Sequence, residues 1–268
     1  MELHNPFIYL NYDFGIKAVF SAVLSGLICS AIGTYIILRK MSFIGAGLSH
    51  VAFAGIAFGF FIGSSPTLWA LVFTLTSGVV IWYLSIKKKI HYDTTLGILF
   101  AASMGLAVMF LSLSNNYGSE ALSYLFGSPL IVSNFDVLLL ILIAFLTFLF
   151  YMFFWREIYL ITFSEDIAKA SGYNVELVTF LAFLVMSFAV TLSIKAVGAL
   201  LVFSLLVMPA ASAFKLTKNY NSFFFLSVFF GFASSILGVF LSFIFDMPSG
   251  AAITLSSFFI FLTSLLRD

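Results

Sequence analysis

The chain carries very little charge for its length. Of its 268 residues, 12 are Lys or Arg and 11 are Asp or Glu, so only 9% are charged. Soluble domains contain about 25% charged residues, and a chain that is 62% hydrophobic could not keep its apolar surface away from water. The mean hydropathy of +1.16 agrees with this. We therefore predict an integral membrane protein in contact with membrane lipid.

Cysteine and the common catalytic motifs are also scarce or missing. The single cysteine, Cys29, excludes an internal disulfide and a metal site built from several thiolates of one chain. The near balance of basic and acidic residues gives no reason to expect nucleic acid as a partner. The sequence has no phosphate-binding loop, zinc-protease histidine pair or recognisable serine triad. We expect no resident cofactor, no catalytic residue and no enzyme activity in this chain.

Long, continuous apolar runs are what the sequence has instead. A helix needs about 20 apolar residues to cross the hydrocarbon, whereas strands of a membrane barrel alternate in polarity. The runs predict an all-α, polytopic membrane protein with about nine transmembrane helices, eight being possible. No signal peptide and no soluble domain are evident, so residues 1–268 are expected to form a single transmembrane domain. The predicted segments are 14–38, 43–62, 66–85, 94–113, 135–155, 175–194, 196–214, 221–244 and 249–266.

Basic residues near the segment ends predict the orientation, because Lys and Arg are retained on the cytoplasmic side. Most of them face inward if the N-terminus is outside and the C-terminus is cytoplasmic. The alternation then requires residues 119–133 to begin and end outside, as a short outer or re-entrant helix; Gly127 and Pro129 favour such a break. The inward-facing residues are Arg39, Lys40, Lys87, Lys88, Lys89, Arg156, Lys169, Lys215, Lys218 and Arg267.

A polar inner loop, residues 156–174, contains the pattern of a short capped helix. Ser164 is a good N-cap, and Glu165 and Asp166 would lie in the first turn, where the helix dipole favours anions. Lys169 follows, and Gly172 can adopt the left-handed exit. The pattern predicts a helix at the cytoplasmic surface, either an ordinary linker or a functional element.

His50 is the one ionisable residue inside an otherwise apolar segment. Ala46 and Ala54 lie one turn on either side, so its own helix face offers no polar partner. The imidazole either bonds to another helix within the bundle or lies on a transport pathway, as ionisable groups in membrane spans often do. Neutral imidazole is also a common ligand of divalent transition metals.

Small residues and outer carboxylates are the remaining candidates. Gly55, Gly59 and Gly63 recur every four residues and predict a face on which helices approach closely. Three carboxylates fall at the predicted outer surface, where they are either simply solvated or attract a cation to an entrance. These are Glu120, Asp136 and Asp246.

Five stretches together resemble one known family. Residues 39–50 (RKMSFIGAGLSH) resemble the R-x-M-S-x-x-G-D-A-L-S-H segment of the zinc/manganese permeases of ATP-binding-cassette importers. Four more stretches resemble the same family in the same order and extend the resemblance over essentially the whole chain. They are 93–99 (DTTLGIL), 123–128 (SYLFGS), 197–213 (VGALLVFSLLVMPAASA) and 246–250 (DMPSG).

The resemblance implies a homodimeric permease in a prokaryotic plasma membrane. Such a permease docks a cytoplasmic ATP-binding subunit, which hydrolyses the ATP, and receives metal from an extracytoplasmic metal-binding protein. The resemblance also implies that the 164–172 helix is the coupling helix that contacts the ATPase. Its expected coupling residues are Ser164, Glu165, Asp166, Ala168, Lys169 and Gly172.

The family pattern also implies a metal-contacting pair, of which this chain keeps half. His50 matches the family histidine, but Ala46 stands where the family has an aspartate. A site of nitrogen ligands alone favours Zn²⁺ as the substrate, with Mn²⁺ and Fe²⁺ open. Two alternatives stay open: a related permease for a metal chelate such as a siderophore or cobalamin, and a non-transporting membrane scaffold or receptor subunit.

Overall fold

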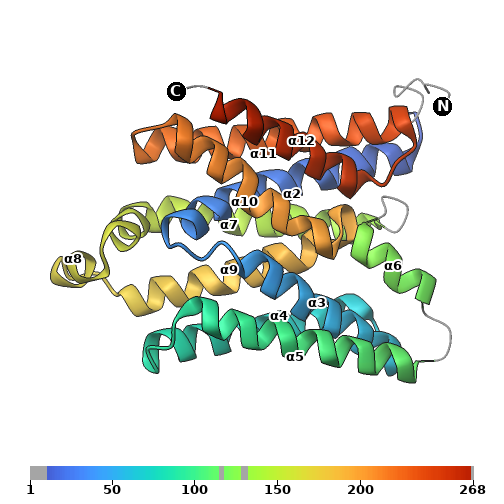
Figure 1. Ribbon diagram of the computed structural model, residues 1–268, viewed down its shortest axis with the longest axis horizontal. Helices are drawn as coiled ribbons and strands as arrows, with labels where there is room; N and C mark the ends of the chain where they lie inside the picture. Colours follow the sequence, from blue (N-terminus) through green and yellow to red (C-terminus); the bar gives the residue numbers. More distant parts are fainter. Residues whose placement is uncertain (1–10, 115–117, 128–131, 267–268) are drawn as a thin grey trace. The chain divides into compact units, whose positions relative to one another are not determined.

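The computed structural model describes residues 11–114, 118–127 and 132–266, and within these ranges the secondary structure is entirely helical (Figure 1). The elements are α2 (Asp13–Leu38), α3 (Ile44–Phe61), α4 (Pro66–Trp82) with a π-helical turn η1 (Tyr83–Lys87), α5 (Tyr92–Leu113), α6 (Gly118–Phe126), α7 (Asn134–Phe163), α8 (Glu165–Ala170), α9 (Val175–Val197), α10 (Ala199–Leu216), α11 (Tyr220–Phe245) and α12 (Ser249–Leu265).

The described helices confirm an all-helical, polytopic membrane protein. Seven are long and apolar enough to cross a membrane: α2, α3, α4 with η1, α5, α7, α9 and α11. The other two predicted segments correspond to shorter apolar stretches, Leu201–Leu216 within α10 and Ser249–Leu265, which is α12. Each of the nine predicted segments therefore coincides with a helix, although seven meet the length criterion for a span.

Helix α7 is longer than predicted. The polar loop was expected to begin at residue 156, but the helix continues to Phe163, with non-helical dihedral angles at Phe154 (φ −110°, ψ 22°). No glycine or proline interrupts residues 134–163, and Ile158 and Ile161 remain buried. The chain therefore continues past the kink as helix because an apolar face still packs against neighbouring residues.

The chain divides into two compact units. The first contains residues 1–34, 118–142 and 192–268, and the second contains residues 35–117 and 143–191. In the first unit α10, α11 and α12 pack on one another, and α6 packs on α10 and α12. In the second unit α3 packs on both α4 and α5. Three of the unit boundaries fall inside α2, α7 and α9.

Helices α3 and α4 pack closely in the second unit because two glycines leave room for the α4 backbone. A Cβ atom on Gly55 would lie 2.5 Å from the Trp69 carbonyl oxygen, and one on Gly59 would lie 2.7 Å from the Pro66 Cα. Gly63 differs from the prediction. It lies beyond the end of α3 with φ +65°, and no atom lies within 4 Å of where its Cβ would be. Gly63 is therefore a turn residue and does not extend this packing face.

Small residues likewise join α2 to α11 in the first unit. A Cβ on Gly26 would overlap the Oγ of Ser235, and a Cβ on Gly231 would overlap the Oγ of Ser30. The Ser227 hydroxyl donates to the Ser30 carbonyl oxygen at 2.8 Å. Close backbone approach between membrane helices depends on such small side chains.

Three backbone segments meet at what we call the glycine junction, formed by Gly127, Gly198 and Gly250. Gly127, just after α6, has φ +77° and lies against the Val197 backbone; Gly198, at the N-cap of α10, has φ +100° and lies against the Phe126 backbone. A Cβ on Gly250 would overlap the Val197 carbonyl oxygen. The predicted short helix is thus present as α6 and breaks at Gly127 as expected, while Pro129 lies outside the described residues.

We predict that Gly198→Ala destabilises the protein, because the residue combines a positive φ with a Cβ position 2.5 Å from the Phe126 carbonyl carbon. The strained backbone alone should cost about 1–3 kcal/mol. The matched control is Gly97→Ala within α5, where no atom lies within 4 Å and alanine favours the helix by up to about 1 kcal/mol. Thermal unfolding of the purified protein in detergent, followed by circular dichroism, tests this. Similar midpoints for the two variants would contradict it.

Candidate functional site

His50 lies on α3 and faces α5. Its half-buried ring makes an edge-on contact with Phe100, with ring centroids 4.5 Å apart at 80°. Gly47 on the same helix leaves room for α5, since a Cβ there would lie 3.2 Å from Leu96 Cδ2. The Nδ1 atom of His50 is buried without a hydrogen-bond partner among the described residues. The alternative of a histidine bonded into the bundle therefore has no support at this nitrogen.

Two hydroxyl groups on the same pair of helices are also without partners. Ser49 Oγ on α3 and Thr95 Oγ1 on α5 are both buried with no hydrogen bond in the described structure. Such groups cost about 1–3 kcal/mol each unless water or a ligand satisfies them. Ala46 adds no ligand, and the described residues contain no group of three or more His, Cys, Asp or Glu placed to hold a metal ion. The site within one chain thus offers a single strong ligand atom.

The predicted short helix is present as α8. The Ser164 Oγ accepts a hydrogen bond from the Ile167 N–H at 3.4 Å, and Gly172 adopts φ +83° at the exit. Ala168 is fully buried, whereas Asp166 is exposed and the side chain of Ile167 is 46% exposed. One face of α8 is therefore buried, and the other carries an apolar side chain that the described residues leave exposed.

Arg39, which the sequence indicated only as an orientation signal, makes a cluster with α8. Its guanidinium donates to a Glu165 carboxylate oxygen, to the Tyr92 hydroxyl at 3.0 Å and to the Ile161 carbonyl oxygen at 3.4 Å. The guanidinium carbon also lies 5.7 Å from the centre of the Tyr92 ring. Glu165 has a second, longer ion pair of 3.9 Å with Lys169. The position of Arg39 at the head of the first family-like stretch was the available clue.

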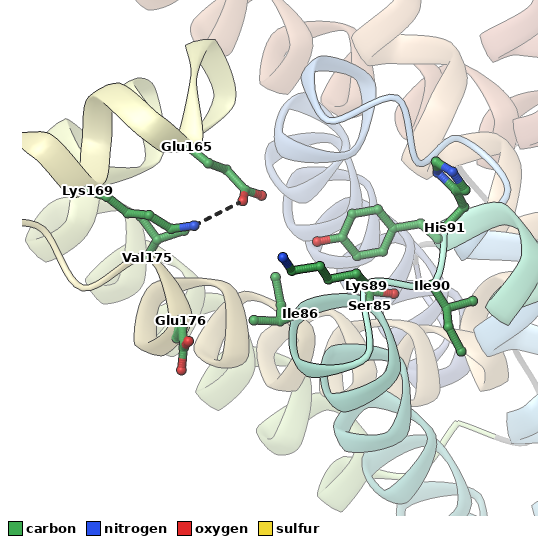
Figure 2. A pocket seen from close by; sticks show the side chains of 10 residues that line it. Ser85, Ile86, Lys89, Ile90, His91, Glu165, Lys169, Val175 and Glu176 are labelled. Atoms are coloured by element: carbon green, nitrogen blue, oxygen red, sulfur yellow. Dashed lines mark ion pairs between the residues drawn. The ribbon is translucent and has the colours of Figure 1, made fainter.

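A pocket of about 450 Å³ lies beside α8 (Figure 2). Glu165 and Lys169 line it from α8, and Figure 2 shows Lys89 extending toward them from the turn after η1. Glu176 lines the pocket from α9 and is ion-paired with Lys87. Both acidic and basic groups thus line the pocket, a lining suited to the polar surface of a protein partner rather than to a metal ion. The remaining lining residues are Ser85, Ile86, Ile90, His91, Tyr92 and Val175.

Of the three predicted outer carboxylates, Asp136 is not where the sequence suggested. It is 6% exposed, and its carboxylate accepts from Lys195 Nζ at 2.8 and 3.0 Å and from the Ser133 hydroxyl at 2.6 Å. A buried carboxylate paired with an ammonium group does not attract cations, so the prediction of a solvated Asp136 is wrong. Glu120 and Asp246 are exposed, and Asp246 ends α11 with φ 49°.

Comparisons with known proteins give one consistent result. The model of the ABC 3 transport family matches residues 11–268. A manganese transport system membrane protein, MntC of Halalkalibacterium halodurans, is 32% identical over 92% of this chain and 84% of its own length. A high-affinity zinc uptake system membrane protein, ZnuB of Haemophilus influenzae, is 29% identical over 94% of this chain and 98% of its own.

A solved structure agrees with these relatives. The chain superposes with a TM-score of 0.84 on a structure described as PsaBC from Streptococcus pneumoniae in complex with Fab. The match has 28% sequence identity and covers 98% of this chain and 96% of that one.

We predict that Lys195→Met strongly destabilises the first unit, because it leaves Asp136 buried without its partner. Breaking a buried pair in this way costs about 3–5 kcal/mol. The control, Lys87→Met, removes an ion pair whose side chains are 43% and 48% exposed and should cost no more than about 1 kcal/mol. Denaturant unfolding in detergent, followed by circular dichroism, measures both. Equal losses in the two variants, or no recovery in Lys195→Met/Asp136→Asn, would refute the assignment.

Proposed function

The chain belongs to the ABC 3 transport family, whose model matches residues 11–268, and from this we infer that it is the permease subunit of an ABC importer of divalent transition metal. Relatives named for manganese transport and for zinc uptake match over more than nine-tenths of the chain and support metal as the cargo. The apolar helices supply the membrane-embedded part of such a machine. The permease itself does not hydrolyse ATP; a partner subunit does.

We assign nine membrane spans to the chain by adding α10 and α12 to the seven helices named above. A span takes 17–25 residues, and α12, with 17, reaches the lower limit. The start of α2 is placed outside and the end of α12 in the cytoplasm of a prokaryotic cell, because the basic residues then face inward. The whole chain acts as one permease domain and works as a homodimer. A cytoplasmic ATP-binding subunit and an extracytoplasmic metal-binding protein complete the importer.

The unpartnered Nδ1 of His50 is the observation that carries the metal contact. It is a neutral nitrogen ligand in a helix whose other side chains are almost all apolar, and the hydroxyls of Ser49 and Thr95 on the same helix pair are unpartnered too. His50 from each copy of the dimer would supply two nitrogens. Nitrogen ligands without a carboxylate favour Zn²⁺ over Mn²⁺, because Ala46 removes the hard oxygen that Mn²⁺ prefers.

Helix α8 is proposed as the coupling helix, with the segment from Ser164 to Gly172 contacting the ATPase. The exposed side chain of Ile167 and the charged groups around the neighbouring pocket offer mixed apolar and polar contacts. In the proposed cycle the binding protein delivers the ion to the outer mouth, where exposed Glu120 and Asp246 attract it. The ion contacts His50 after losing water, and ATP-driven movement of α8 switches access.

The metal contact predicts that His50→Ala abolishes ATP-dependent uptake, because the nitrogen ligand is lost. Uptake of Zn²⁺ and Mn²⁺ at buffered free concentrations is measured in proteoliposomes holding the permease, its ATPase and its binding protein. Ala46→Asp should shift the Zn²⁺/Mn²⁺ uptake ratio toward Mn²⁺, about five- to 150-fold for a 1–3 kcal/mol change.

The unfolding midpoint of each variant is the control for misfolding in this assay. Unchanged metal uptake in His50→Ala would rule out the transit role. Failure of the native complex to move either free metal, with uptake of a metal chelate instead, would favour a chelate permease.

The coupling role predicts that Ile167→Asp prevents the ATPase from co-purifying with the permease, because a desolvated carboxylate replaces an apolar contact. Leu177→Asp is the matched control: Leu177, in the first turn of α9, is 47% exposed against 46% for Ile167. Quantitative pull-down of the ATPase with each permease variant measures the effect. Equal ATPase recovery with both variants would contradict a docking role for α8.

A further inference from the structure

We propose that Arg39 is a positioning residue that ties α8 to the helices around His50, so that movement of α8 reaches the metal path. The inference rests on the proposed role of α8 as the coupling helix. The Arg39 guanidinium would then connect α8, which contacts the ATPase, with the helices that carry and contact His50.

Arg39 joins the ends of four helices. It directly follows α2, and its side chain donates to the first residue of α8 (Glu165), the first residue of α5 (Tyr92) and the last turn of α7 (the Ile161 carbonyl). A planar guanidinium can hold several acceptors at fixed angles, which the point charge of a lysine cannot. The side chain is 11% exposed, so that water screens these contacts weakly.

Helix α8 depends on such a tie because it is only six residues long. Its N-cap and its Glu165–Lys169 ion pair are internal to the segment, so they do not hold it against another helix. Among the described residues, the burial of Ala168 and the contact of Glu165 with Arg39 do this. The Arg39 contact is directional and lies in the first turn, so it sets the angle at which α8 leaves α7.

The two helices that meet at His50, α3 and α5, both begin close to Arg39. Toward α3 the chain makes a tight turn in which the Met41 N–H donates to the Ile36 carbonyl oxygen at 3.0 Å, and Met41 is fully buried. Helix α3 starts at Ile44 and carries His50 about 9 Å further along its axis. Helix α5 starts at Tyr92 and carries Phe100, the ring against His50. A shift of the guanidinium thus acts on the proposed metal ligand and on its aromatic neighbour together.

The test is the number of metal ions transported per ATP hydrolysed by the reconstituted complex. Arg39→Lys keeps the charge but loses the planar fork, and should lower this ratio at least about fivefold while ATP hydrolysis continues. Glu165→Gln should act in the same direction, and the double variant should show no further loss because both changes break one link. Lys87→Gln is the control, since it breaks an ion pair at the same pocket that does not involve α8. A native ratio in Arg39→Lys would overturn the proposal.

A second readout does not depend on transport. The one native cysteine, Cys29, is buried, so a spin label directed to Ile167→Cys reports on α8 in the permease alone. Adding Arg39→Gln should increase the label mobility, while adding Lys87→Gln should not. Unchanged mobility overturns the tie between Arg39 and α8. A native complex that couples no transport to ATP would instead refute the proposed function, and the label would still decide the role of Arg39.

Discussion

The protein depends on one constraint: polar groups carried into an apolar medium must find partners within the chain, because hydrocarbon offers none. Many hydroxyl groups find an acceptor within their own helix; Thr147, for example, donates to the carbonyl oxygen of Ile143, one turn earlier. Buried charged groups pair with a group of opposite charge, as Lys195 does with Asp136. Several buried polar atoms of the described helices lack such a partner, and among them the Nδ1 of His50 is the strongest metal ligand.

Close packing is the second requirement, and glycine meets it in both units. In the second unit Gly55 and Gly59 let α4 approach the backbone of α3. In the first unit the glycine junction joins three segments that lie far apart in the sequence. The three glycines of this junction come from three of the five family-like stretches, which therefore share one structural role. A fourth stretch begins with Arg39, which contacts the ends of α5, α7 and α8.

Local patterns predicted most of the helices and α8, because hydropathy and capping are properties of neighbouring residues. Long-range pairs could not be predicted this way. Lys195 and Asp136 are 59 residues apart, and Arg39 and Glu165 are 126 apart, so no local pattern marks either pair. The same limit explains the error at Asp136, where a position near a helix end suggested solvent although a distant lysine covers it. At Gly63 the four-residue spacing was right, but the helix had already ended.

The packing of α2 on α11 has a consequence for biogenesis. Ser30 emerges from the ribosome about 200 residues before Ser227 and Gly231, the residues that cover it. At 5–20 residues per second, synthesis of that interval takes roughly 10–40 s. The second unit, by contrast, ends at Thr191 and has all its residues by then. Until α11 arrives, the small polar face of α2 needs a temporary partner, either lipid headgroups, the insertion machinery or a neighbouring helix.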